Sequence, residues 1–100
     1  MISIAEIKSF IEPVVKKYPI ERVILFGSYA RGVAIDTSDI DLVVESNGKM
    51  RNSNIFTLGG ELLVNLPIRV DVYDMLEIKE NSPLYNRIKE EGIVIYETST

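Results

Sequence analysis

The chain of 100 residues contains no cysteine and no histidine. Without cysteine, the protein has no disulfide bond, no thiol nucleophile and no structural zinc site of the cysteine type. Without histidine, it lacks the commonest general base, a Ser-His-Asp triad and histidine metal ligands. Any catalysis must therefore rely on carboxylates, hydroxyl groups, lysine, arginine or a bound metal ion.

Positive charge and long apolar runs are also scarce. The formal net charge is −4, and the 11 basic residues are scattered, with Lys16 and Lys17 as the only adjacent pair. This distribution argues against an extended nucleic-acid-binding surface, which requires clustered lysine and arginine. No stretch approaches the ~20 apolar residues of a membrane span, and the N-terminus is amphipathic, unlike a signal peptide. We therefore expect a cytoplasmic protein that does not bind membranes.

The length fits one domain, residues 1–100, and leaves no room for a second. Apolar spacing predicts an alternation of four helices and four strands, hence an α/β or α+β fold. Ser3 and Glu6 have capping-box spacing, Pro13 predicts a kink or break in the first helix, and Gly59-Gly60 weakens the third. The predicted helices are 3–17, a short one within 27–32, 53–66 and 82–92; the predicted strands are 22–26, 38–45, 68–73 and 93–96, followed by a frayed tail at 97–100.

The turn Phe26-Gly27-Ser28, where a predicted strand passes into a helix, is the first candidate functional feature. Glycine allows close approach of the backbone, the serine hydroxyl can bond an oxyanion, and a helix N-terminus favours negative charge. These properties predict a small phosphate cradle. The alternative is an ordinary helix N-cap that follows a strand.

The pair Asp39 and Asp41, separated by Ile40, is the second feature. Strand alternation puts both carboxylates on one face, about 7 Å apart along the backbone. Two carboxylates on one face repel each other unless a cation lies between them, and magnesium prefers such oxygen ligands. The alternative is a solvated strand end in which Asp39 caps a turn.

Asp71 is the third feature. It lies between Val70 and Val72, so its side chain shares the opposite strand face with Arg69. Aspartate within a strand is disfavoured and needs a reason, which could also be a salt bridge to Arg69 or exposure on an edge strand. Asp74, at the strand end, is more typical of a cap.

Taken together, the three features predict one site. Two carboxylates on one strand and a third on another can hold two magnesium ions about 4 Å apart. The glycine-serine turn would grip the triphosphate that the ions bridge, and Asp71 would accept a proton from an acceptor hydroxyl.

These residues carry a family resemblance. Gly27-Ser28, followed after ten residues by Asp39-Ile40-Asp41, resembles the signature of the DNA polymerase beta-like nucleotidyltransferase superfamily. The longer runs 25–32 and 38–42 are similar to its minimal nucleotidyltransferase (MNT) branch. The resemblance covers nearly the whole chain and implies the polymerase beta-like fold, a small mixed sheet with helices packed on one face.

The resemblance also implies roles for individual residues. Gly27 and Ser28 would contact the β- and γ-phosphates of ATP. Asp39 and Asp41 would ligate both magnesium ions, and Asp71 would ligate one of them and activate the acceptor.

Two further positions in the signature have less definite roles. Arg31 would approach the phosphates, with an exposed salt bridge on its helix as the alternative reading. Tyr29 would stack on the base, but a tyrosine in the core or at the surface is the simpler interpretation.

The family further implies a partner. Larger members bind the acceptor with a second, often helical domain, whereas MNT proteins are typically encoded beside a HEPN-type protein, a helical ribonuclease toxin. Such an MNT protein acts as antitoxin by transferring AMP to a tyrosine of the toxin. Two alternatives stay open: a non-catalytic module that neutralises a partner by contact, marked by an unpaired apolar surface patch, or an antibiotic nucleotidyltransferase subunit whose acceptor pocket an oligomer completes.

Overall fold

A four-stranded mixed sheet with strand order β3-β2-β1-β4 organises the protein, whose computed structural model describes residues 2–98. β1 pairs antiparallel with both β2 and β4, and β2 pairs parallel with β3. The parallel pair is joined by a crossover through α3, as such pairs require. The elements are α1 (Ile4–Val15), β1 (Arg22–Phe26), α2 (Ser28–Arg31), β2 (Ile40–Glu45), α3 (Asn52–Asn65), β3 (Val70–Asp74), the 3-10 helix η1 (Met75–Glu77), α4 (Pro83–Glu91) and β4 (Ile93–Glu97).

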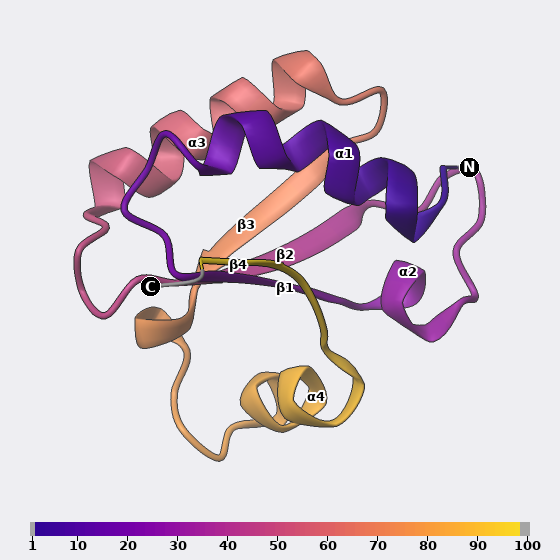
Figure 1. Ribbon diagram of the computed structural model, residues 1–100. Coiled ribbons are helices and arrows are strands. Elements are labelled where there is room, and N and C mark those ends of the chain that lie inside the picture. Colours follow the sequence, from indigo (N-terminus) through magenta and orange to yellow (C-terminus); the bar gives the residue numbers. More distant parts are fainter. Residues whose placement is uncertain (1, 99–100) are drawn as a thin grey trace.

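The main core lies between the sheet and the helices α1 and α3, which cover one face (Figure 1). Alternate residues of the strands supply the sheet side of this core, and Leu25, Ile40 and Leu42 are each 0% exposed. The helices contribute their apolar stripes, including Ile7, Ile11, Leu58 and Leu62. The predicted mixed sheet and α/β class are thus confirmed.

The opposite face is also covered, which corrects the expectation that the helices pack on one face only. α4 and η1 lie on that side of the sheet (Figure 1). A smaller buried cluster holds them there, formed by Phe26, Val43 and Ile88. Phe26 and Val43 point away from the main core because each follows a core residue along its strand.

The predicted N-terminus of α1 is confirmed. Ser3 and Glu6 form a reciprocal capping box, with the Ser3 hydroxyl accepting from the Glu6 amide at 3.1 Å. Pro13 does not break the helix, which continues through it to Val15. Only two residues of α1 follow the proline, so the helix ends within a turn of it.

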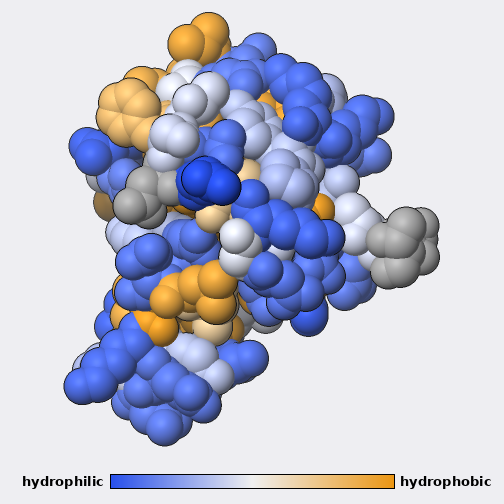
Figure 2. Space-filling model, turned by 90° about the vertical axis from the view of Figure 1, so that its left-hand side faces the viewer, coloured by the Kyte–Doolittle hydropathy of each residue, from blue (hydrophilic) through white to orange (hydrophobic). Residues whose placement is uncertain are grey.

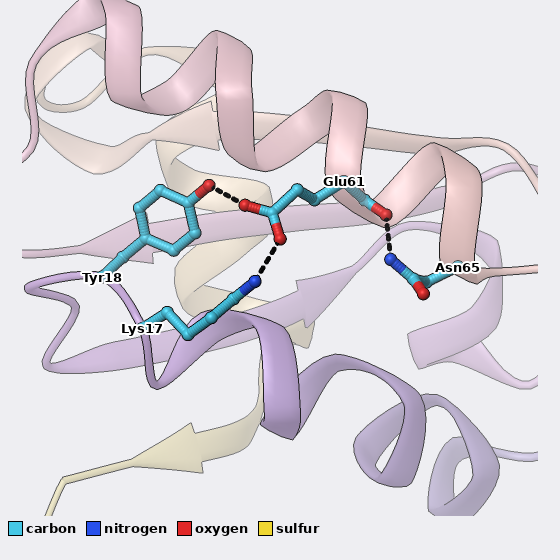
Figure 3. A network of polar contacts seen from close by, with 4 residues as sticks. All are labelled: Lys17, Tyr18, Glu61 and Asn65. Carbon is cyan, nitrogen blue, oxygen red and sulfur yellow. Dashed lines mark hydrogen bonds and ion pairs between the residues drawn. The ribbon is translucent and has the colours of Figure 1, made fainter.

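A polar network ties the end of α1 to α3 (Figure 3). The Glu61 carboxylate accepts hydrogen bonds from the Tyr18 hydroxyl and from Lys17 Nζ, and Asn65 Nδ2 donates to the Glu61 carbonyl at 2.7 Å. Burial, followed by the contact with Glu61, raises the pKa of Tyr18 to about 12. The two hydrogen bonds lower the pKa of the Glu61 carboxyl.

Other boundaries differ modestly from the predicted ones. β2 begins at Ile40 because the preceding residues form a turn, in which the Ser38 hydroxyl accepts from the Ile35 amide at 2.8 Å. β3 begins at Val70, where pairing with β2 starts. α3 passes through Gly59-Gly60 without a break.

At the C-terminus, Glu97 closes β4 and the Thr98 amide donates to the Glu21 carbonyl at 2.9 Å, so the predicted frayed tail is wrong for these two residues. Ser99 and Thr100 lie outside the described residues. Between residues 2 and 98, none of the helices is both long and apolar enough to cross a membrane.

Candidate nucleotide and metal site

The turn between β1 and α2 is shaped for close approach of another group. Gly27 has φ 79° and ψ −156°, a conformation essentially restricted to glycine. A Cβ atom placed there would lie 2.4 Å from Oδ2 of Asp41, closer than any contact allows. The absence of a side chain at Gly27 therefore allows the Asp41 carboxylate to approach the backbone of the turn closely. Ser28 is the next residue and begins α2.

Asp41 and Asp71 meet across the parallel strands β2 and β3. They are register partners, and Asp41 also pairs with Phe26 at the end of β1. Both carboxylates lie on the face that α4 covers, because Leu42 and Val70 face the main core. The sheet thus brings together two aspartates that are 30 positions apart in the sequence.

The surroundings of the Asp41 carboxyl disfavour its charged form. Burial raises the pKa of the Asp41 carboxyl, and the negative charges of Asp71 and Asp39 raise it further, against a smaller opposing effect of Arg31 and Arg87. Burial and the charges of Asp71 and Asp41 likewise raise the pKa of the Tyr73 hydroxyl. A concentration of like charge of this kind favours a cation or a proton at the site.

Asp39 and Asp71, like Asp41, are partly exposed. Asp39 precedes β2 by one residue and is half-buried. The Asp71 side chain is 32% exposed and lies 3.5 Å from Arg69 Nε, so the salt bridge considered from the sequence is present as well. Tyr73 lies near Asp71 and Asp41, with its ring 5.7 Å from that of Phe26.

A fourth acidic residue completes the surroundings of the glycine turn. The Gly27 amide donates to Oε1 of Glu91 at 3.2 Å, and Arg31 Nη1 donates to both Glu91 oxygens at 3.1 and 3.3 Å. The helix salt bridge predicted as an alternative for Arg31 therefore exists, and its partner is the last residue of α4. Glu91 was not predicted, since no local pattern connects positions 60 residues apart.

Comparison with known proteins shows the family of the chain. The family model described as "Polymerase beta, Nucleotidyltransferase" matches residues 9–100. The chain belongs to this nucleotidyltransferase family. The protein named "Putative protein adenylyltransferase MJ0604", from Methanocaldococcus jannaschii, is 31% identical over 96 residues, which cover 90% of this chain and 94% of that protein.

Solved structures share the fold. A crystal structure of a toxin-antitoxin with AMP-PNP superposes with a TM-score of 0.79 and 23% identity, covering 92% of this chain and 74% of the other. A chain from the complex of a tri-AMPylated Shewanella oneidensis HEPN toxin with MNT antitoxin gives a TM-score of 0.73 at 21% identity, covering 95% and 73%. The polymerase beta-like fold expected from the sequence is thereby confirmed.

In this nucleotidyltransferase the aspartate carboxylates provide suitable ligand atoms for magnesium but do not complete its coordination shell. Their oxygens are the ligands that magnesium prefers, and burial, with the negative charges of Asp71 and Asp39 added to it, raises the pKa of the Asp41 carboxyl. Within residues 2–98, however, no three acidic side chains lie close enough to enclose an ion by themselves. This arrangement suits an ion that takes one or two carboxylates and completes its shell with water and substrate phosphates.

Tyr29 lies in the core of the nucleotidyltransferase domain. Its side chain is 5% exposed and packs in the main cluster between the sheet and α1. A ring enclosed in this way has no free face to stack on a base, so the interpretation as a core tyrosine holds.

A groove of about 640 Å³ lies between α3 and the edge strand β3, and Asp71 is one of the residues that line it. Its walls are largely apolar and include Phe56, Leu63 and Val72, while Arg69 and Asp71 stand at its polar part. Gly59 and Gly60 also line it and add no side chain to the helix wall. The groove therefore connects an apolar surface with a candidate catalytic carboxylate.

Proposed function

We propose that this nucleotidyltransferase transfers AMP from ATP, with magnesium, to a tyrosine hydroxyl of a HEPN-type partner, and acts as its antitoxin. The observation that carries the proposal is the pairing of Asp41 with Asp71 beside the Gly27 turn. The names of the relatives support the donor and the partner, since one is named a protein adenylyltransferase and others are toxin-antitoxin complexes.

The chain's own residues have distinct roles in an in-line transfer. Gly27, Ser28 and Arg31 hold the β- and γ-phosphates and leave the α-phosphorus near the aspartates. The acceptor oxygen attacks that phosphorus, its proton passes to Asp71, and the bond to the β-phosphate oxygen breaks to release pyrophosphate.

Each magnesium ion would be held by one or two of the carboxylates of Asp39, Asp41 and Asp71, together with water and phosphate oxygens. When bound, it supplies positive charge that neutralises the triphosphate and the leaving pyrophosphate. All three aspartates are therefore assigned to the metal, and Asp71, which lines the groove, is assigned to the acceptor as well.

The experiment is incubation of the protein with α-labelled ATP and magnesium, with and without a HEPN-type protein encoded beside it. We expect label on the partner, located by peptide mapping to a tyrosine. Label on neither protein, in a mixture that still contains their stable complex, would overturn the transfer reaction.

Contact alone is a second candidate function, and one observation favours it. Three apolar side chains of α3 are largely exposed: Phe56 at 85%, Val64 at 84% and Leu63 at 58%. Figure 2 shows hydrophobic side chains gathered at the surface near the top of the molecule, where α3 lies. An apolar patch of this kind is typical of a protein-protein contact. Neutralisation that survives loss of the aspartates would establish this function.

A further inference from the structure

The anion-binding groups at the glycine turn already hold an anion, the Glu91 carboxylate. The Gly27 amide and the Arg31 guanidinium both donate to it, over distances of 3.1 to 3.3 Å. The Glu91 side chain is only 19% exposed. These are the groups that the proposed function assigns to the phosphates of ATP.

The backbone beside Glu91 is packed tightly against β1. A Cβ atom at Gly92 would lie 2.4 Å from the Ile88 carbonyl oxygen and 2.6 Å from Cγ2 of Ile24. The end of α4 is thus pressed against β1, with no space for even one additional carbon. Glu91 is the residue immediately before this contact, so its backbone lies close enough to the turn for its carboxylate to reach Gly27 and Arg31.

We propose that Glu91 occupies the place of a substrate phosphate and must leave the Gly27 amide and Arg31 before a nucleoside triphosphate can bind there. The inference rests on the proposed function, because it assumes that the site binds a triphosphate. A backbone amide has one hydrogen to donate, and two anions at the same donors repel each other. The carboxylate therefore competes with the phosphate and lowers the apparent affinity for nucleotide.

The competition also links the nucleotide to α4. While Glu91 is bound, it joins the end of α4 to the β1–α2 turn across 60 residues or more of sequence. A triphosphate that displaces it releases this connection. The site thus has two states, with either a protein carboxylate or a phosphate at the turn, and nucleotide selects the second.

The test compares the binding of AMP-PNP and magnesium to the wild type, Glu91→Gln and the matched control Glu90→Gln by calorimetry. Glu90 is the exposed neighbour and undergoes the same change of charge. We expect Glu91→Gln to bind about tenfold tighter, the equivalent of one charge-assisted hydrogen bond, and Glu90→Gln to bind like the wild type. Adenosine, which has no phosphate, should bind all three proteins equally.

A second measurement needs no variant. In the wild type, the ¹³C signal of the Glu91 carboxyl should shift when AMP-PNP saturates the protein, and that of Glu90 should not. An unmoved Glu91 signal, or an affinity of Glu91→Gln equal to or weaker than that of the wild type, would overturn the competition. Failure of all three proteins to bind AMP-PNP would overturn the proposed function together with it.

Discussion

The two faces of the sheet are built from alternate residues of the same strands, yet they differ in composition and in cover. The face under α1 and α3 is apolar and buried from solvent, and Leu25, Ile40 and Leu42 have no exposed surface. The face toward α4 has a smaller apolar cluster and carries Asp41 and Asp71. One face supplies the burial that stabilises the fold, and the other presents charges that burial disfavours.

This division explains how so small a domain can hold repelling carboxylates. The charged form of Asp41 is disfavoured by burial and by its acidic neighbours, so it costs stability in the absence of a cation. The extensive core on the other face offsets that cost. Neighbouring residues of one strand should therefore respond in opposite ways to substitution.

The largest effect is expected for Asp39→Asn combined with Asp41→Asn. Transfer of labelled AMP should fall at least ~10³-fold, because the charges that hold the metal and the triphosphate are removed. The melting temperature should stay equal or rise, since removal of like charges relieves repulsion. Transfer at the wild-type rate by a folded double variant would remove these aspartates from the mechanism.

Leu42→Ala tests the other face at the adjacent position. Leu42 is 0% exposed, so its truncation should cost about 2–5 kcal/mol in the free energy of unfolding. In a domain of this size, the melting temperature should fall by more than about 8 °C. Val64→Ala is the control, because Val64 is 84% exposed and its truncation should change stability by less than about 0.5 kcal/mol.

Gly27→Ala tests the turn between β1 and α2, beside the Asp41 carboxylate. Strain at φ 79° and the 2.4 Å approach to Asp41 predict a loss of about 1–3 kcal/mol and weaker nucleotide binding. The control is Gly60→Ala, where a Cβ would meet nothing within 4 Å. Because alanine favours a helix, that change should stabilise the protein by about 0.5–1 kcal/mol. Thermal unfolding of both variants gives the comparison.

Local signals predicted the elements well. The Ser3 and Glu6 pair located the start of α1, and the apolar run before Gly27 gave β1 with its exact bounds. Pro13 and Gly59-Gly60 disfavour helix by propensity, but packing of the surrounding apolar residues outweighs that preference. Asp39 and Asp41 were identified from their spacing and Asp71 from its place within a strand, and the register of β2 and β3 pairs Asp41 with Asp71.

Long-range features were beyond the sequence. Nothing local shows that α4 crosses to the second face, because its apolar residues would fit either side of the sheet. The place of Glu91 depends on the side of the sheet on which α4 packs, so its contact with Gly27 and Arg31 could not be predicted either. The only signal was an arginine at an exposed helix end that needed an acidic partner, and 15 acidic residues were available.

The smallest expected effect is the pH dependence of stability that two carboxylates cause, one on each side of the sheet. Glu61, between α1 and α3, has a lowered pKa because of its hydrogen bonds to Lys17 and Tyr18. Its contribution to stability is therefore present above the unfolded pKa of about 4.3 and lost as the pH falls through the lower folded value. Asp41 has a raised pKa, so the folded state binds its proton more tightly than the unfolded chain does.

The melting temperatures of Glu61→Gln and Asp41→Asn are each compared with that of the wild type between pH 7 and pH 3. The two differences from the wild type should have opposite signs. At pH 7, Glu61→Gln should melt slightly below the wild type and Asp41→Asn slightly above it. Both differences should shrink on acidification, that of Asp41→Asn first, because its folded pKa lies above the ordinary value of about 3.9 and that of Glu61 lies below 4.3. The same sign for both variants at pH 7 would contradict the opposite pKa shifts of the Glu61 and Asp41 carboxyls.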